Sequence, residues 1–415
     1  MNKMMNRLFC WTVALLALTL SCSKTPDIPD PEDGLPPFPK PSTQIDRVPL
    51  TRAEQGFVEA GNSFAWRLTK KVWDGDSEKK SLILSPLSVQ YALGMLGNGA
   101  DATVSAKLAG VLGYEGTDAI NEFCAKLIKT LPQVDTSITL ALADGVLVND
   151  RFTLKAPFKS AVETYYDALV ESMSFSDRQA VIKYVNDWCE KHTYGRIKDV
   201  IKDMDPYALM YIMNAIYFNA DWTSQFDKAA TRDESFRKLS GGSVKVGMMH
   251  QTLDALYGEN DWGQAVTLPY GNGKFVLNVY LPKKKDGLAA IPDPKQLAGA
   301  GELCHVVLSL PRFKTDYLVE MRDLLADMGL PITPYTELVE NDSATISKVI
   351  HKATITVDES GTEAAAVTII EMKYTSAGPD VNPRTVTFTA DHPFLYTISE
   401  RTSGAILFTG VYTGE

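Results

Sequence analysis

Five histidines supply the imidazole groups that a general base or a metal site would need, but their spacing predicts neither. His192, His250, His305, His351 and His392 are far apart, and no two lie within reach on one helix turn. The chain also lacks the Gly-x-Ser-x-Gly, His-Glu-x-x-His and phosphate-loop patterns that mark common hydrolases and nucleotide sites. We therefore expect no enzyme, no cofactor and no metal site.

The cysteines are the other candidate nucleophiles and ligands. Cys10 and Cys22 lie near the N-terminus, which leaves Cys124, Cys189 and Cys304 in the body of the chain. An odd number of widely spaced cysteines without Cys-x-x-Cys spacing fits neither a disulfide framework nor a zinc site. We expect buried free thiols.

The charge balance excludes one class of partner. The 415 residues carry 41 Lys and Arg against 51 Asp and Glu, a net charge of −10. A chain this acidic lacks the basic surface that nucleic acids and anionic membranes attract. We expect no nucleic-acid binding, and contact with a membrane only through a lipid anchor.

The N-terminus has the pattern of an export signal. Lys3 and Arg7 precede an apolar run at residues 8–20, which suits a secretory signal and is too short to span a bilayer. The run ends in TLSC at residues 19–22, which resembles a bacterial lipobox with Cys22 as the acylated residue. The alternative is an ordinary signal peptide with an incidental cysteine. We expect a lipid-anchored bacterial cell-envelope protein or, under that alternative, a periplasmic or extracellular one.

Three segments follow from this pattern. Residues 1–21 are the expected signal peptide. Residues 22–50 hold eight of the chain's 22 prolines and predict an extended spacer. Residues 51–415 form the expected folded domain.

Helix signals dominate the first half of this domain and strand signals the second. Helices are expected at 88–112, 161–170 and 181–192. Strand-like runs occur at 276–281, 305–310, 353–357 and 405–412. This segregation predicts an α+β fold.

Residues 359–370, ESGTEAAAVTII, have an unusual composition for a loop that follows a strand. Gly361 offers a hinge, and small or β-branched residues follow it. Thr362, Ala364 and Ala366 begin the set that would share one face of a strand, while the charge of Glu363 falls on the other face. The segment is therefore suited to entering a sheet as an extra strand.

This segment resembles the proximal hinge of a serpin's reactive-centre loop. Further motifs resemble the same family: SPLS at 85–88, NAIYF at 214–218 followed by Trp222, LPY at 268–270, LPRF at 310–313 and FTADHPFLYTI at 388–398. One departure is NAD at 219–221. The chain is thus identified as a member of the serpin family over residues 51–415.

The resemblance implies a serpin fold, with three β-sheets, eight to nine helices and an exposed reactive-centre loop. It implies a monomeric suicide-substrate inhibitor: a protease cleaves the loop, an acyl-enzyme forms, and the loop inserts into the main sheet. The residues it assigns to the hinge are Glu359, Gly361, Thr362, Glu363, Ala364, Ala365 and Ala366. It assigns Ser85, Ser88, Asn214 and His351 to the shutter under the main sheet, and Trp222 to the breach where insertion begins. The alternatives are a core histidine for His351, a core aromatic for Trp222 and a solvated strand end for Glu359.

Counting from Gly361 places the reactive bond at Thr375–Ser376, with Lys373 and Tyr374 as alternative cleavage sites. These residues suit trypsin-, elastase- and subtilisin-like serine proteases, with cysteine proteases as a further class of target. The alternative function is that of a non-inhibitory serpin, a binding or carrier protein. A bulky or charged hinge would have favoured that alternative.

Overall fold

The computed structural model describes residues 44–362 and 383–415, which contain seven α-helices and fifteen strands. The α-helices are α1 (Arg52–Gly75), α2 (Pro86–Gly97), α3 (Ala102–Leu112), α4 (Thr117–Val134), α5 (Ala156–Tyr166), α6 (Arg178–His192) and α7 (Arg322–Asp327). Two 3-10 turns, η1 (Lys228–Ala230) and η2 (Pro294–Gln296), complete the helical elements of these residues. No helix in the described ranges is long and apolar enough to cross a membrane.

Two of the expected helices have different limits. The stretch 88–112 forms two helices, because α2 ends at Gly97 and Asp101 caps a new helix by accepting hydrogen bonds from the N–H groups of Thr103 and Val104 at 2.8 and 2.9 Å. The stretch 161–170 is helical only up to Tyr166, and its last two residues start strand β3. The helix expected at 181–192 lies within α6, and the four strand-like runs fall on strands except for Ala405, which precedes β15.

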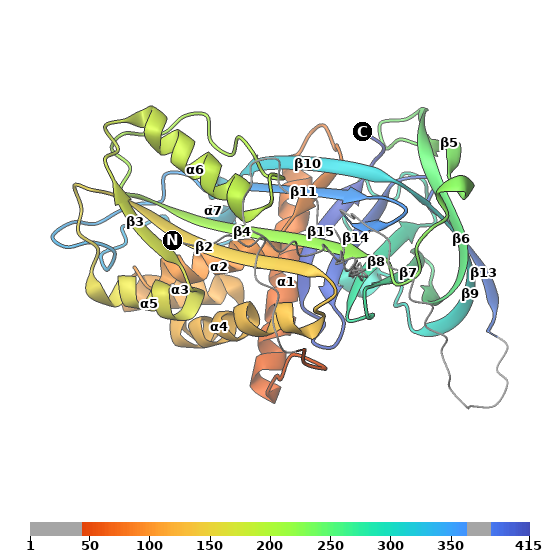
Figure 1. Ribbon diagram of the computed structural model, residues 1–415, viewed down its shortest axis with the longest axis horizontal. Coiled ribbons are helices and arrows are strands. Elements are labelled where there is room, and N and C mark those ends of the chain that lie inside the picture. Colours follow the sequence, from red (N-terminus) through yellow and green to blue (C-terminus); the bar gives the residue numbers. More distant parts are fainter. Residues whose placement is uncertain (1–43, 363–382) are drawn as a thin grey trace, which may run out of the picture.

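A six-stranded sheet forms one layer of the molecule (Figure 1). Its strands, in spatial order, are β10 (Phe313–Glu320), β11 (Ile350–Val357), β12 (Gly361–Thr362), β4 (Met210–Asp221), β2 (Thr139–Asn149) and β3 (Leu169–Met173). Helix α6 covers one face of this sheet, and α2, α4 and α5 lie on the other. Among the described residues, β4 and β11 share no ladder pair, and each pairs with the short β12.

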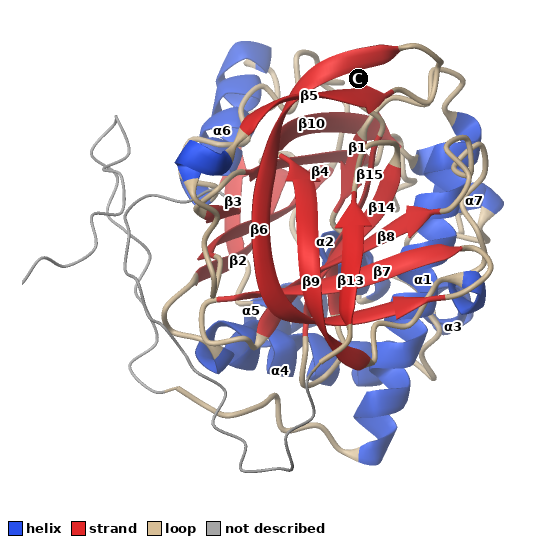
Figure 2. Ribbon diagram, turned by 90° about the vertical axis from the view of Figure 1, so that its right-hand side faces the viewer, coloured by secondary structure: helices blue, strands red, loops and turns tan. Residues whose placement is uncertain are grey.

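The remaining nine strands form one continuous sheet. They are β1 (Leu82–Leu84), β5 (Arg232–Arg237), β6 (Ser243–Glu259), β7 (Gly263–Tyr270), β8 (Phe275–Pro282), β9 (Glu302–Pro311), β13 (Thr385–Thr389), β14 (Phe394–Glu400) and β15 (Ile406–Tyr412). The long, curved β6 pairs with β5, β7 and β9 and so connects these strands into a single sheet (Figure 2). The predicted α+β fold class is confirmed, with two sheets among the described residues where the resemblance implied three.

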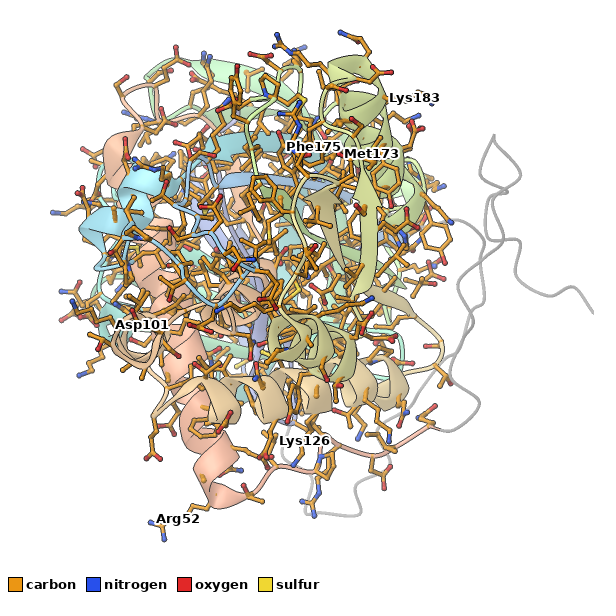
Figure 3. All side chains as sticks on the ribbon, turned by 90° about the vertical axis from the view of Figure 1, so that its left-hand side faces the viewer. Arg52, Asp101, Lys126, Met173, Phe175 and Lys183 are labelled. Atoms are coloured by element: carbon orange, nitrogen blue, oxygen red, sulfur yellow. The ribbon has the colours of Figure 1, made fainter. Side chains whose placement is uncertain are left out.

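Two hydrophobic cores hold these layers together. The larger one lies between the two sheets, where α2 packs against both β4 and β15 and is buried along most of its length. The smaller one lies under α6 and includes Phe175, with Met173 packed against it and Lys183 on the outer side of the helix (Figure 3). Because α2 packs against both sheets, a movement of β4 would change the contacts of this helix.

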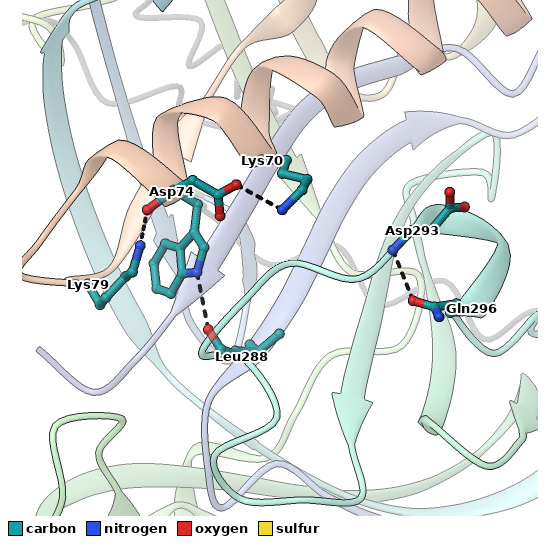
Figure 4. Close-up of polar contacts among 7 residues, drawn as sticks. Lys70, Asp74, Lys79, Leu288, Asp293 and Gln296 are labelled. Atoms are coloured by element: carbon teal, nitrogen blue, oxygen red, sulfur yellow. Dashed lines mark hydrogen bonds and ion pairs between the residues drawn. The ribbon is translucent and has the colours of Figure 1, made fainter.

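The C-terminal end of α1 ties the helical layer to the loop after β8 (Figure 4). The indole Nε1 of the buried Trp73 donates to the carbonyl of Leu288 at 3.1 Å, and the Lys79 ammonium group contacts the Trp73 carbonyl. In the same loop, the backbone N–H of Asp293 donates to Gln296 Oε1 at 3.1 Å in a capping box of η2. The bond to Leu288 satisfies the indole N–H of Trp73, which would otherwise be buried without a partner.

Candidate functional site

The chain leaves β11 through a tight turn and re-enters the sheet as β12. The N–H of Asp358 donates to the carbonyl of Gly361 at 2.9 Å, and Asp358 Oδ1 accepts from the N–H groups of Ser360 and Gly361 at 2.8 and 3.3 Å. Thr362 then pairs with Val357 on β11 and with Ala220 on β4, antiparallel to both. The start of the predicted hinge is therefore already a strand of the six-stranded sheet.

Gly361 is required at its position by close packing. A Cβ atom at this residue would lie 2.1 Å from the carbonyl oxygen of Ala220 and 2.7 Å from the Cα of Asp221. Both neighbours are backbone atoms of β4 and cannot rotate away. The sequence predicted a hinge glycine for its flexibility, and the structure adds that any side chain here would separate β12 from β4.

Trp222 holds the turn at residues 358–361 through two hydrogen bonds. Its indole Nε1 donates to the carbonyl of Asp358 at 2.8 Å, and its backbone N–H donates to the carbonyl of Ser360 at 2.8 Å. Its ring stacks on Tyr270 with centroids 4.3 Å apart and an interplanar angle of 11°. Trp222 is a buried aromatic, as the alternative held, and it also contacts the turn that begins the hinge.

Thr362 points into the core. Its side chain is 3% exposed, and its hydroxyl forms a hydrogen bond with the hydroxyl of Tyr270. Burial raises the pKa of Tyr270 well above its usual range, so this tyrosine stays neutral and available for the bond. Tyr270 was quoted in the LPY motif but given no role, and only the fold brings it under the hinge.

Glu359 is a buried carboxylate, which excludes the solvated strand end considered for it. It is 5% exposed and lies 3.8 Å from an Arg312 guanidinium nitrogen. Its backbone carbonyl accepts from the N–H of Phe226 at 2.9 Å. Arg312 comes from the LPRF motif at the start of β10, so that motif and the hinge meet at this ion pair.

A second group of polar side chains lies under the sheet at the first turn of α2. His351 Nε2 accepts from the backbone N–H of Ser85 at 3.0 Å, and Ser85 Oγ donates to the carbonyl of Leu407 at 3.0 Å. The Ser88 hydroxyl bonds Asn214 Oδ1. The four predicted shutter residues thus lie together, linking α2 with β4, β11 and β15.

His351 and Asp144 are the titratable groups of this polar cluster. Burial lowers the pKa of His351 to about 4, so the imidazole is neutral at physiological pH and free to accept the Ser85 bond. Asn214 Nδ2 donates to Asp144 Oδ1 at 2.7 Å. Sequence inspection did not single out Asp144, because an aspartate in a strand carries no signal of its partner on another strand.

A protein-family model described as Serpin (serine protease inhibitor) matches residues 59–414. This chain belongs to the serpin family. Serpin-Z3 of Arabidopsis thaliana is 33% identical over 382 residues, which span 85% of this chain and 96% of the relative. Protease inhibition is the activity that the family description names.

Two solved structures have the same fold as this serpin. The Arabidopsis AtSerpin1 structure, in its native stressed conformation, superposes with a TM-score of 0.76 at 25% identity, covering 88% of this chain and 99% of that one. Human thyroxine-binding globulin in complex with thyroxine superposes with a TM-score of 0.75 at 25% identity, covering 86% of this chain and 98% of that one. The shared fold therefore includes a member whose structure holds a small ligand.

Several predicted residues of this serpin lie outside the described ranges. They are Cys22, Glu363, Ala364, Ala365, Ala366, Lys373, Tyr374, Thr375 and Ser376, together with the signal segment 1–21 and most of the spacer. Among the predicted thiols, Cys124, Cys189 and Cys304 are buried and free, as expected.

Proposed function

We propose that this serpin is a suicide-substrate inhibitor of serine proteases that acts by inserting its cleaved loop into the six-stranded sheet. The observation that carries the proposal is β12. Gly361 and Thr362 already pair with strands on both sides, and Thr362 faces the core between Ala220 and Val357. A segment that continued from Thr362 would run antiparallel between β4 and β11.

The register supports insertion of the residues that follow. Every two-residue step beyond Thr362 moves two residues back along both neighbouring strands. Residues 364, 366 and 368 would then lie level with Phe218, Ile216 and Asn214 on β4, and with Ile355, Ala353 and His351 on β11. Ala364, Ala366 and Thr368 are small and uncharged, so none would bury an unpaired charge. Thr368 would arrive at the polar cluster.

The chemistry is that of an arrested proteolysis. The serine hydroxyl of the protease adds to the carbonyl carbon of Thr375, the C–N bond to Ser376 breaks, and the released amine takes the hydroxyl proton. The ester that remains ties the protease to the loop. Insertion then moves this ester away from the geometry that water needs to hydrolyse it.

The alternative is a carrier role, since thyroxine-binding globulin has the same fold. The hinge sequence favours inhibition instead. An alanine- and threonine-rich segment is suited to entering a sheet, whereas a carrier needs no such segment. The proposed targets are trypsin-, elastase- and subtilisin-like serine proteases, with cysteine proteases as a further class, and the proposed active form is a monomer.

We also propose export and lipid anchoring. The support is the sequence of residues 1–22, in which a short apolar run with two preceding basic residues ends at Cys22. A proline-rich spacer would hold the inhibitor away from the membrane surface. Metabolic labelling with a fatty acid, compared between the natural protein and Cys22→Ser, tests the anchor.

The function is tested by mixing the protein with trypsin, elastase and subtilisin and separating the products on a denaturing gel. A covalent complex of the combined mass minus the released C-terminal peptide supports inhibition. Cleavage without a complex by all three enzymes contradicts it. Protease with its active-site serine blocked is the matched control and must give no complex.

A further inference from the structure

Asp144 lies at the centre of β2, directly opposite Asn214 on β4. Its side chain is 4% exposed and faces the larger core, on the same side of the strand as Leu140 and Val146. A carboxyl group in such a position has lost nearly all of its hydration. It is stable as an anion only where hydrogen bonds or cations replace the water.

Hydrogen bonds within the protein replace only part of the lost hydration of Asp144. Asp144 Oδ1 accepts one hydrogen bond from Asn214, at 2.7 Å, whereas Oδ2 is buried without a partner among the described residues. An ionised carboxylate has room for about four hydrogen bonds, so this one is mostly unsatisfied. The hydroxyl of Tyr91, on α2, is a second buried polar atom that lacks a partner within the described part of the chain.

The groups that face Asp144 add no positive charge. Tyr91 on α2, Cys124 on α4 and Tyr166 on α5 are neutral neighbours whose own pKa values are raised mainly by burial, with the Asp144 charge as a smaller contribution. The carboxylate of Asp167, at the end of α5, repels the anion. Among the described residues, no Lys or Arg forms an ion pair with Asp144.

We propose that Asp144 is a further member of the shutter, and that binding of a proton to its carboxyl group holds β2 and β4 firmly on α2. The connection runs from Asp144 through Asn214 to the Ser88 hydroxyl on the first turn of α2. With the proton bound, the native sheet is stabilised and β4 separates less readily from β11. With the proton lost, the buried charge weakens the native sheet and eases insertion, a consequence that rests on the proposed function.

Burial raises the pKa of Asp144 to about 7, and Asp167 adds to the increase against the opposing bond from Asn214. The folded protein therefore binds this proton between the ordinary aspartate pKa and pH 7, while the unfolded chain does not. The stabilisation is complete only below the ordinary aspartate pKa, falls progressively as the pH rises, and is lost once the pH has passed through about 7. The unfolding equilibrium constant should change by about tenfold between pH 6 and pH 8 from this group alone.

His351, on β11, contributes with the opposite sign. Its pKa is lowered to about 4, so the unfolded chain takes up a proton on falling below about pH 6.5 while the folded protein does not. The two effects partly cancel in the natural protein. The natural protein must therefore be compared with a variant that lacks only the Asp144 carboxyl group, so that the contribution of His351 cancels.

The test is the pH dependence of stability, measured by urea unfolding between pH 6 and pH 8 for the natural protein and for Asp144→Asn. The variant keeps the shape and one acceptor oxygen but cannot ionise. We expect the ratio of the two unfolding constants to change by about tenfold over this range, with the variant relatively more stable at pH 8. Parallel profiles would overturn the proposal.

Tyr91→Phe is the matched control, since it removes the adjacent unpartnered hydroxyl without touching a group that titrates in this range. Its profile should run parallel to that of the natural protein. If Asp144→Asn does not fold, infrared spectroscopy of the natural protein tests the titration directly. The absorption band of a buried protonated carboxyl group must disappear between pH 6 and pH 8. Absence of that change would also overturn the proposal.

The coupling to insertion is measured with one protease at pH 6 and pH 8. The rate of covalent complex formation by the natural protein, relative to Asp144→Asn, should be greater at pH 8 than at pH 6. An unchanged ratio would refute the link to insertion. If neither protein forms a complex with any protease, the proposed inhibitory function is wrong, whereas the stability profiles still decide the role of Asp144.

Discussion

The hydroxyl of Thr362 meets the hydroxyl of Tyr270 beneath the point where the hinge enters the six-stranded sheet. Tyr270 in turn stacks on Trp222, whose indole holds the carbonyl of Asp358 at 2.8 Å. One short chain of contacts therefore connects the first inserted side chain with the turn that precedes it. A substitution at Thr362 would therefore disturb the contacts of Tyr270 and Trp222 before any later residue of the loop could enter the sheet.

Thr362→Arg should convert the inhibitor into a substrate. The site is 3% exposed and lies on the core face, so an arginine would be buried without a counter-charge or would keep β12 out of the sheet. The ester would then hydrolyse before insertion. We expect the covalent complex on the gel to be replaced by cleaved protein, while circular dichroism remains that of the folded protein. Thr362→Ser is the control and should retain the complex; a normal yield from the arginine variant would contradict the assigned register.

Gly361→Ala should also slow insertion, for a different reason. The new methyl group would lie 2.1 Å from the carbonyl oxygen of Ala220, so β12 must move away from β4. We expect a lower ratio of complex to cleaved protein and a loss of roughly 1–3 kcal/mol in the free energy of unfolding, as for other overpacked sites. Gly110→Ala, which meets nothing within 4 Å in α3, is the control. Equal behaviour of the two variants would mean that β12 does not pack as described.

His351→Gln should remove an acid sensitivity of the fold. The folded protein holds this imidazole neutral with a pKa of about 4, so stability contributed by the neutral ring is complete above about pH 6.5 and is lost as the pH falls toward 4. We expect the natural protein to lose roughly 2–3 kcal/mol relative to the variant over that range. Urea unfolding at several pH values measures it, and a constant difference between the two proteins would contradict the assignment.

Cleavage of the loop should raise thermal stability. Insertion adds a strand between β4 and β11, completing ladder bonds that β12 begins. The melting temperature is compared before and after a nick near Thr375, with the cleavage confirmed by mass spectrometry. A nicked protein that melts at the same or a lower temperature would count against an inhibitory serpin.

Sequencing of the C-terminal peptide released in a covalent complex locates the reactive bond. We expect it to begin at Ser376 for elastase- or subtilisin-like enzymes, or at Thr375 or Tyr374 where the protease cuts after Tyr374 or Lys373. Trypsin-like enzymes should cut after Lys373, which shortens the inserted segment and lowers the yield of complex. A productive complex whose peptide starts before Met372 or after Pro379 would refute this placement.

Much of this protein was determined by local sequence. The short motifs around Ser85, Asn214 and Phe388 lie in elements with strong strand or helix preferences, so the serpin family and its α+β class could be predicted from them. The small residues after Gly361 likewise predicted a segment able to join a sheet. Preferences of this kind depend on neighbours in the chain, which a sequence displays directly.

Other properties came from contacts between distant segments. The long β6 connects nine strands into one sheet, so the described residues form two sheets where three were expected. The helix expected at 88–112 is divided, because Asp101 caps a new helix. The need for glycine at position 361 comes from the backbone of Ala220, and the burial of Glu359 from the packing of β10 beside the hinge. The unsatisfied carboxyl of Asp144 likewise depends on which helices cover β2. Only the tertiary structure decides these features, because steric contact and loss of hydration depend on which atoms meet in space, and residue types at distant positions do not specify those meetings.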